Sequence, residues 1–407
     1  MSTISNPELN LLLKRGVSEI IAEDEMVKLL ESERPLRLKQ GFDPSCPDIH
    51  LGHVVGLRKL RQFQERGHHV VLIVGDWTAQ IGDPSGESIT RPMLTPQEVQ
   101  ANAQTFMEQF FKVVDKNKTE VRWQSEWYDS FGLDDIIKLT SKFTVAQLMA
   151  REDFAQRYSS GRPITLTEML YPLLQGYDSV AIEADVEFGG NDQKFNCLLG
   201  RELQQMMGQP PQQVFLVPLL VGTEGRQKMS KSLSNYIGID ETPTETYGKV
   251  MSIPDHLIIN YLELVTDVPD SEIAGFKEQM ANESTNPMTV KKRLAYEIVA
   301  QFHSKQDAHE AENHFTRVFQ ERDMPEEIPT INNLTGPGST LTALLTRAGL
   351  TKSRAEAKRL LAQGAIEVDG DRVTEDIINI RDGSIIRVGK RHFVRIVNTT
   401  NISNSQS

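Results

Sequence analysis

Residues 36–41, LRLKQG, and residues 69–74, HVVLIV, enclose the part of the chain that decides its fold. The first stretch follows Pro35 and is typical of a short strand. The second is a continuous apolar run of strand length, as found in parallel strands buried on both faces. Between them, Leu51 to Glu65 carries apolar residues at helical spacing, and Gly67 is placed to end that helix. The order strand, loop, helix, strand predicts a parallel α/β unit.

The segment 47–53, PDIHLGH, puts His50 and His53 at the start of this predicted helix. A helix N-terminus presents unpaired N–H groups and the positive end of the dipole, so the place suits a phosphate. Gly52 has no side chain and would let a ligand lie against the first turn. Two other interpretations remain open. The histidines either cap and pack the helix, or belong to a metal site, although no nearby Cys, His or Asp cluster supplies the remaining zinc ligands.

Composition bounds the class of protein. The 407 residues favour two or three domains, and the net charge of -12 argues against a chain that is basic throughout. Cys46 and Cys197 lie far apart, which indicates no disulfide framework and a reducing compartment. The start, MSTISNPELN, lacks the basic and apolar regions of a signal peptide, and no apolar run approaches membrane-spanning length. We therefore predict a cytoplasmic protein with no membrane partner.

The C-terminal part is basic, unlike the rest of the chain. From Leu341 onward there are eleven Lys or Arg and seven Asp or Glu residues, a net +4 after a body of -16. This asymmetry indicates a polyanionic partner, with a merely solvated basic domain as the alternative. Ser353 is placed to cap a helix that ends at Gly364, with strands at 366–368 and 385–388. That helix carries the basic residues Arg354, Lys358 and Arg359.

Other segments have weaker patterns. Residues 95–160 are mostly helical in pattern and begin with a capping box, Thr95 to Glu98. Residues 180–188 and 214–221 are predicted to be further strands, residues 243–325 all helical, and 326–340 a linker rich in Pro, Gly, Asn and Thr. The polar tail 398–407 is expected to be disordered.

A second chemical signal lies at residues 227–234, QKMSKSLS, after an apolar strand and a glycine-bearing turn. Lys228 and Lys231, three apart among small hydroxyl residues, suit a mobile loop that folds over a triphosphate. A lone loop of this kind is usually solvated surface. Here it follows a histidine pair at a helix start, which favours a shared phosphate site.

HLGH and KMSKS, in this order on an α/β chain, resemble the two signatures of class I aminoacyl-tRNA synthetases. With GFDPSCPDIHLGH, IGDPSG, YPLLQGYD, GGNDQ and QKMSKSLSNYIGI, the resemblance narrows to bacterial tyrosyl-tRNA synthetases and runs through most of the chain. It implies a Rossmann-like doubly wound parallel sheet in a catalytic domain, then an all-α domain and a small α+β alpha-L RNA-binding domain. The implied boundaries are 1–240 for the catalytic domain with a helical insertion at about 95–160, 241–328 for the helical tRNA-binding domain, 329–340 for the linker, 341–397 for the RNA-binding domain and 398–407 for the tail.

The resemblance also implies an activity. Tyrosine would react with ATP to give tyrosyl-adenylate and pyrophosphate, and tyrosine would then pass to the 3′ end of its tRNA. Mg²⁺ would arrive with ATP, because no carboxylate cage for a metal is visible in the sequence. The implied partners are tyrosine, ATP, tRNA(Tyr) and a second copy of the chain, joined near residues 120–160, with no DNA. The alternatives are tryptophan activation on the same scaffold, a nucleotidylyltransferase with the same histidine motif, and a catalytically silent RNA-binding protein.

Tyr171, Gln175 and Asp178, at positions i, i+4 and i+7, share one face of a predicted helix although Pro172 interrupts its bonding. A phenol, an amide and a carboxylate can hold an amino acid. By the resemblance, Asp83, Tyr171 and Gln175 bind the α-amino group, Asp178 accepts from the phenolic hydroxyl, and Gln193 lies on the amino-acid side. The catalytic residues would be His50, His53, Lys228 and Lys231, and Arg91 would lie near the pyrophosphate. The ATP site would comprise Gly41, Asp43, Ser45, His50, Gly52, His53, Gly190, Asp192, Lys228, Ser230 and Lys231.

Three positions depart from the family pattern. Better-known members have a tyrosine and a cysteine where this chain has Lys39 and Gln40. The familiar second contact to the substrate hydroxyl is therefore missing or replaced, which leaves Asp178 with more of the discrimination. Glu87 stands where many members have a basic residue, so a pyrophosphate contact there is in doubt.

Overall fold

The computed structural model describes residues 6–32, 34–44, 48–83, 94–320, 328–332, 340–376, 380–389 and 392–397. The chain forms two compact units, residues 1–308 and 309–407. The domain boundaries expected at residues 240, 328 and 340 stay predictions. No helix in the described part of the chain is both long enough and apolar enough to span a membrane.

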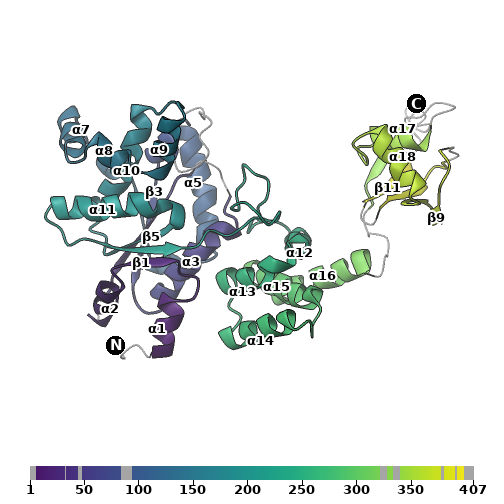
Figure 1. The fold of residues 1–407 in the computed structure, drawn as a ribbon, viewed down its shortest axis with the longest axis horizontal. Helices are drawn as coiled ribbons and strands as arrows, with labels where there is room; N and C mark the ends of the chain where they lie inside the picture. The colour runs from purple at the N-terminus through teal and green to yellow at the C-terminus, as the bar shows by residue number, and fades with distance from the viewer. Residues whose placement is uncertain are drawn as a thin grey trace, which may run out of the picture. The chain divides into compact units, whose positions relative to one another are not determined.

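The first unit is built on a six-stranded sheet with the order β1-β6-β5-β2-β3-β4 (Figure 1). Five neighbouring strands are parallel, and β1 pairs with β6 in the antiparallel sense. The predicted strand, helix and strand around the histidine pair are confirmed as β2, α3 and β3. The strands are β1 Glu19–Ile21, β2 Arg37–Phe42, β3 His69–Val74, β4 Thr119–Trp123, β5 Val186–Gly190 and β6 Gln213–Val217.

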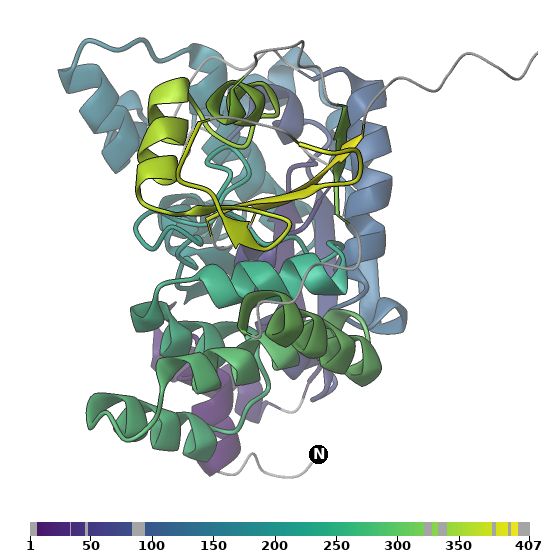
Figure 2. The same cartoon turned by 90° about the vertical axis from the view of Figure 1, so that its right-hand side faces the viewer.

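Helices cover both faces of this sheet (Figures 1 and 2). On one face, Phe63 of α3 packs edge-on against Phe188 of β5 and Phe215 of β6, with ring centroids 5.3 and 5.7 Å apart. On the other face lie α10 and α11, which cross where Gly176 and Gly200 bring the two backbones close. The helices are α1 Asn6–Leu13, α2 Glu23–Glu31, α3 Leu51–Gln64, α4 Thr78–Ile81, α5 Pro96–Phe110, α6 Ser125–Tyr128, α7 Leu133–Thr140, α8 Val145–Leu148, α9 Glu152–Ser159, α10 Leu166–Ala181 and α11 Lys194–Met206.

The strand order reverses between β2 and β5. From β2 the chain proceeds outward through β3 to β4, and from β5 it proceeds the other way to β6. The loops that leave the carboxyl ends of β2 and β5 therefore diverge and open a crevice, the place where doubly wound sheets bind ligands.

Three expectations about the sheet are corrected. Residues 95–160, predicted to be mostly helical, contain a strand, β4. The sequence did not reveal it because the alternation Thr119, Val121, Trp123 is too short to stand out among helical patterns. Residues 180–185 are not strand: α10 continues to Ala181, and β5 begins only at Val186. The strand predicted to reach residue 221 ends at Val217, because Pro218 cannot donate to the ladder. The capping box at Thr95 is confirmed, with Pro96 in the first turn of α5.

The segment 243–320 is helical, as predicted, and its first part packs on α3. Arg58 of α3 and Arg15 both donate to the Thr266 carbonyl, and Arg58 also pairs with Asp267 at 2.7 Å. The buried face of the helix at residues 287–302 includes Val290, Leu294 and Ile298. The elements are α12 Pro243–Ser252, α13 Ile258–Val265, α14 Asp270–Ala281, α15 Pro287–Phe302, α16 Lys305–Phe315 and a π-helical turn Thr316–Gln320.

The second unit ends in a small α+β module. A five-stranded sheet of order β7-β11-β10-β8-β9 packs against two helices, and Leu345, Leu361, Ile366 and Ile386 form part of its core. The predicted helix capped by Ser353 and the two strands after it are confirmed. The elements are β7 Thr330–Asn332, α17 Leu341–Arg347, α18 Arg354–Ala362, β8 Ile366–Val368, β9 Asp371–Arg372, β10 Ile385–Val388 and β11 His392–Val397.

The linker prediction at 326–340 is partly wrong. Thr330–Asn332 forms β7, which pairs in parallel with β11, so these residues belong to the module rather than to a free connection. A three-residue strand gives too short a pattern to be seen in sequence. The tail 398–407 lies outside the described residues.

Candidate active site

A pocket opens at the carboxyl ends of β2 and β5, where the strand order reverses. It brings together segments that are far apart in the sequence: the β2 loop, the start of α3, the middle of α10, the β5 loop and the loop after β6. Its lining includes the predicted residues Gly41, Asp43, His50, Gly52, His53, Asp83, Tyr171, Gln175, Asp178, Gly190, Asp192, Gln193, Lys228 and Ser230. The structure thus places most of the predicted site in one cavity. Ser45, Arg91 and Glu87 lie outside the described residues.

The two histidines cap helix α3 and also line the pocket. His50 is the N-cap residue, and its Nδ1 accepts from the Gly52 N–H at 3.1 Å. Nδ1 of His53 accepts in turn from the His50 N–H at 3.2 Å, and the two rings stack with centroids 4.0 Å apart. A Cβ at residue 52 would lie 2.9 Å from the His50 ring, so glycine is needed to make room for the capping imidazole. Capping and lining the pocket are therefore not exclusive.

Burial determines the protonation state of both rings, and the caps determine which nitrogen carries the proton. Burial and the neighbouring charges of His53 and Lys231 lower the pKa of His50 to about 2, and burial and Lys231 lower the pKa of His53 to about 4. Both imidazoles are therefore neutral near pH 7. Because each Nδ1 accepts a backbone hydrogen bond, the single proton of each ring resides on Nε2. The site holds two neutral N–H donors beside the start of a helix.

The lysine-bearing loop after β6 is held near this helix by two carboxylates. Lys228 Nζ lies 2.9 Å from Asp192 Oδ2, and Lys231 Nζ pairs with Asp48, a residue of the quoted histidine segment. Lys228 and Ser230 line the pocket, whereas Lys231 does not: it lies over the Tyr236 ring, 5.6 Å from its centroid. The two lysines are thus paired with acidic side chains at the mouth of the pocket.

Tyr171, Gln175 and Asp178 do share one face of α10, as predicted. The Tyr171 hydroxyl donates to Asp43 Oδ2 at 2.8 Å, and the other oxygen of Asp43 accepts from the Thr78 hydroxyl at 2.6 Å. Burial raises the pKa of Asp43 to about 7. Asp43, expected on the nucleotide side, therefore also anchors a residue of the predicted tyrosine site.

Asp178 lines the pocket and is only 2% exposed. Its carboxylate accepts from Gln124 Nε2 at 2.8 Å, Trp127 Nε1 at 3.2 Å and the Tyr128 hydroxyl at 3.3 Å. Burial raises the pKa of Asp178 to about 7, opposed by the charge of Lys39 and by the Gln124 bond. Three donors thus hold a single buried carboxylate in place.

Asp83 and Gln193 meet beside Tyr171 and Gln175. Gln193 Nε2 donates to Asp83 Oδ2 at 2.6 Å, and the buried Arg151 approaches Asp83 Oδ1 at 3.5 Å. Asn196 links the two amides, donating to Gln193 Oε1 at 3.0 Å and to Gln175 Oε1 at 2.9 Å. Among the residues that the structure describes, no group of three or more His, Cys, Asp or Glu side chains could hold a metal ion.

In the second unit, the basic helix α18 presents Arg354, Lys358 and Arg359 to solvent, and all three side chains are exposed. Its capping residue Ser353 accepts from the Glu356 N–H. A helix with three exposed cations and a buried apolar side at Ala357 and Leu361 can position phosphates.

Comparisons with known proteins agree with this geometry. The family model of class I tRNA synthetases for tryptophan and tyrosine matches residues 31–320, and the S4 domain model matches residues 341–376. The chain belongs to the class I tRNA synthetases. The resemblance seen in its motifs, including the C-terminal RNA-binding module, is confirmed.

Curated relatives match this synthetase over nearly its whole length. A tyrosine–tRNA ligase of Dehalococcoides mccartyi is 58% identical, over 97% of this chain and 99% of the relative. A tyrosine–tRNA ligase of Thermotoga maritima is 49% identical, over 95% and 96%. Among solved structures, tyrosyl-tRNA synthetase from Archaeoglobus fulgidus complexed with L-tyrosine matches with a TM-score of 0.61 at 23% identity, covering 75% of this chain and 99% of that one. This structural likeness shows the shared fold.

The sequence analysis of this synthetase missed the residues that donate to Asp178. Gln124, Trp127 and Tyr128 follow β4 directly, and they escape notice because the pattern around β4 predicts helix. The carboxyl end of a parallel strand would have been the signal. Asp48 lies within the quoted histidine segment, but its partner Lys231 is 183 residues away, so nothing local marks it.

We predict that Asp48→Asn strengthens ATP binding by this synthetase. The resemblance implies that Lys231 binds ATP phosphates, which would then compete with the Asp48 carboxylate for this lysine. The carboxylate is 45% exposed, so the pair is worth little. The KM for ATP in pyrophosphate exchange should fall roughly two- to fivefold. Asp240→Asn, which removes a similar pair with Lys112, is the matched control. A raised KM would mean that Asp48 supports the loop instead.

Proposed function

We propose that this synthetase activates tyrosine with ATP and transfers it to the 3′ end of tRNA(Tyr) in the pocket described above. One observation carries the site assignment: a helix start with two neutral N–H donors and a buried carboxylate, Asp178, line the same cavity. The first suits phosphates, and the second suits the hydroxyl of a substrate side chain. The nearly full-length tyrosine–tRNA ligase relatives favour tyrosine over tryptophan, and they disfavour a nucleotidylyltransferase or a silent RNA-binding protein.

Activation requires no covalent bond to the protein. A carboxylate oxygen of tyrosine attacks the α-phosphorus of ATP, the bond to the bridging oxygen breaks, and pyrophosphate leaves with the electron pair. Positioning and charge stabilisation dominate such a transfer. The Nε2–H groups of His50 and His53 would donate to phosphate oxygens in the transition state, and Lys228 and Lys231 would add positive charge after exchanging their carboxylate partners for phosphate.

The other assignments follow the same division of the pocket. Gly41, Asp43, Gly52, Gly190, Asp192 and Ser230 would line the nucleotide, with Ser45 and Arg91 completing its site. Asp83, Tyr171, Gln175 and Gln193 would hold the α-amino group. Mg²⁺ would come bound to ATP and neutralise phosphate charge. We place the enzyme in the cytoplasm, where aminoacylated tRNA is consumed.

The histidines should act mainly in the transition state. We predict that His50→Ala or His53→Ala slows tyrosyl-adenylate formation by about two orders of magnitude or more, with tyrosine affinity nearly unchanged, since each removes a preorganised donor. Single-turnover kinetics measures the rate, and equilibrium dialysis measures tyrosine binding. Because each imidazole also caps α3, the melting temperature must be measured alongside. A variant with a normal activation rate and poor tyrosine binding would contradict the assignment.

Asp178 should read the phenolic hydroxyl. Its ionised form is the stronger acceptor, and its pKa is about 7, so kcat/KM for tyrosine should rise with pH and level off above about 7. Asp178→Asn should flatten this rise and reduce the preference for tyrosine over phenylalanine roughly ten- to hundredfold. Pyrophosphate exchange with both amino acids at several pH values measures both effects. If the rise persists in the variant, it belongs to Asp43, whose pKa is raised equally.

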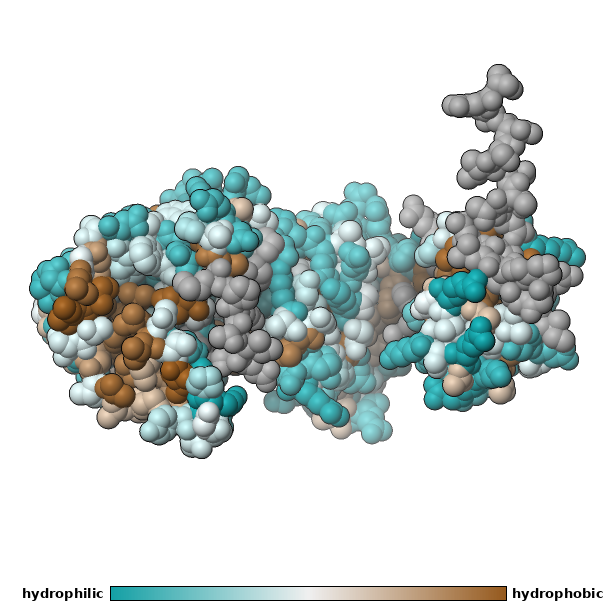
Figure 3. Space-filling view, turned by 90° about the horizontal axis from the view of Figure 1, so that it is seen from above, coloured by the Kyte–Doolittle hydropathy of each residue, from teal (hydrophilic) through white to brown (hydrophobic). Residues whose placement is uncertain are grey.

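A homodimer is the assembly we propose. Large apolar side chains gather at the end of the first unit where α7 and α8 lie, on the left of Figure 3. Exposed patches of this kind mark interfaces. The residues are Leu133, Ile137, Val145, Tyr158 and Leu166, each between 57% and 81% exposed.

We predict that Ile137→Asp separates the dimer. A charge buried in an apolar interface without a partner is costly, so the sedimenting mass at micromolar concentration should fall from twice 45.9 kDa to 45.9 kDa. Lys138→Asp, on the neighbouring position of the same helix but polar already, is the control. A wild-type chain that sediments as a monomer would rule out the proposal.

The S4 module should bind tRNA through phosphates. We predict that replacing Arg354, Lys358 and Arg359 by alanine raises the KM for tRNA and leaves pyrophosphate exchange intact. The salt dependence of tRNA binding should weaken by roughly 0.7 to 0.9 in slope for each phosphate that the module no longer binds. Lys28→Ala, which removes an exposed cation of the first unit, is the control. Equal loss of exchange and charging would indicate a structural role, and no loss a solvated face.

A further inference from the structure

A buried ion pair lies beneath the amino-acid end of the pocket. Lys39 of β2 and Glu187 of β5 are direct neighbours in the parallel register, and Lys39 Nζ lies 2.9 Å from Glu187 Oε1. Their side chains are 0% and 2% exposed. Lys39 does not line the pocket, so it does not replace the family's tyrosine as a direct contact, whereas Glu187 does line it.

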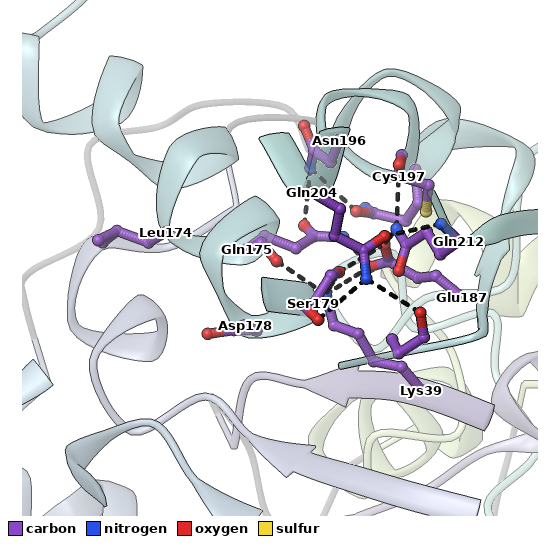
Figure 4. Close-up of polar contacts among 12 residues, drawn as sticks. Lys39, Leu174, Gln175, Asp178, Ser179, Glu187, Asn196, Cys197, Gln204 and Gln212 are labelled. Carbon is purple, nitrogen blue, oxygen red and sulfur yellow. Dashed lines mark hydrogen bonds and ion pairs between the residues drawn. The ribbon is translucent and has the colours of Figure 1, made fainter. Parts of the chain in front are cut away.

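Every hydrogen-bonding group of the pair is used (Figure 4). The three protons of the Lys39 ammonium point to Glu187 Oε1, to the Ser179 hydroxyl at 2.8 Å and to the main-chain carbonyl oxygen of Gln175 at 2.7 Å. Glu187 Oε1 also accepts from Gln175 Nε2 at 3.1 Å, and Oε2 accepts from Ser179 and Gln212. A fully satisfied buried pair of this kind holds its neighbours in one geometry.

Glycine keeps space for this arrangement. A Cβ at Gly200 of α11 would lie 2.9 Å from Gln212 Nε2, 3.1 Å from the Ser179 hydroxyl and 3.3 Å from Glu187 Oε2. The close approach of α10 and α11 therefore packs backbone directly on the network. The side chains of this hydrogen-bond network cannot move toward α11, so the groups that they bond are held in one position.

Gln175 is the network's link to the pocket. A side-chain amide can rotate by about 180°, which exchanges the positions of its NH₂ donor and its oxygen acceptor. Glu187 Oε1, which pairs with Lys39, accepts from Nε2 of Gln175 at 3.1 Å. The Oε1 side is turned toward Asn196, which donates to it at 2.9 Å, and Gln175 lines the same pocket as Asp83 and Tyr171.

We propose that Lys39 and Glu187 are positioning residues for the substrate's α-ammonium group, because they lock the amide of Gln175 with its oxygen toward that group. This inference rests on the proposed role of Gln175 in tyrosine binding. Lys39 holds Glu187 Oε1 in place as the acceptor for Gln175 Nε2. Without the lysine, this carboxylate would lose the ion pair that holds it against the amide, and Asn196 alone would orient Gln175.

A buried pair seldom adds stability over apolar residues of the same size, because desolvation offsets the attraction. Control of the orientation of a neighbouring side chain, here the Gln175 amide, therefore explains two buried charges in adjacent central strands better than stability does. The neighbouring pair Arg37–Glu120, from the same strand β2, is 35% and 40% exposed and does not contact Gln175. It serves as a matched comparison.

The test compares two ligands. L-Tyrosine carries the ammonium, and 3-(4-hydroxyphenyl)propionate lacks only that group. Equilibrium dissociation constants of both are measured for the full chain and for Lys39→Met, Glu187→Gln and the control Arg37→Met. We expect Lys39→Met and Glu187→Gln to weaken tyrosine roughly ten- to hundredfold, and the propionate less than about threefold. The control should leave both unchanged, and KM for ATP should not move.

The outcomes separate the alternatives. If both ligands weaken equally, or only the melting temperature falls, the pair is structural and the inference is overturned. Gln175→Met removes the acceptor itself and should reproduce the selective loss of tyrosine binding. If Gln175→Met shows the selective loss of tyrosine binding and the Lys39 and Glu187 variants do not, the positioning role of the pair is refuted, whereas the proposed role of Gln175 in tyrosine binding is supported. If Gln175→Met has no effect, both fail. Glu187→Gln keeps the side-chain shape, so it tests the idea even where Lys39→Met does not fold.

Discussion

The pairing of β2 with β5 is the constraint on which the rest of the site depends. These two strands lie side by side at the centre of the sheet, yet the chain continues from them in opposite directions. Their loops must diverge, and the crevice between the loops receives α3 from one strand and the 190–193 turn from the other. Every segment of the pocket is placed relative to this pair. The register also sets Lys39 opposite Glu187, so one pairing fixes both the shape and the charge of the pocket floor.

Structural and catalytic uses of the histidine motif turn out to be one arrangement. Capping consumes the Nδ1 atoms of His50 and His53, which leaves Nε2 as the proton-bearing nitrogen of each neutral ring. The cap thus orients the Nε2–H donors that the proposed chemistry needs, and both rings keep this proton while neutral near pH 7. Gly52 belongs to the same arrangement, since a side chain there would displace the His50 ring. This is why the motif requires two histidines and a glycine at fixed spacing.

The sequence predicted the parallel fold, the helix after the histidines and the grouping of residues from five distant segments, because strong periodicity and motifs carry these features. It missed β4, misplaced the start of β5 and hid β7 in a linker, since short strands leave little pattern. The hydrogen-bond partners of the site residues could not be predicted from the sequence, for a different reason. Asp48 with Lys231 and Tyr171 with Asp43 are joined only by tertiary folding, and no local rule pairs side chains more than a hundred positions apart.

Lys39 shows how a departure from a family pattern is best interpreted. Alone in the strand LRLKQG it is only a missing tyrosine, and Glu187 alone in VEFGG is an acid in an apolar strand. Together they form a closed network under Gln175, at the proposed ammonium end of the pocket. The proposed hydroxyl end is built elsewhere, where Gln124, Trp127 and Tyr128 donate to Asp178. In this proposal the missing tyrosine is not replaced at its own position. Polar support for one end of the substrate would come from α6 and the residue before it, and for the other end from β2 and β5.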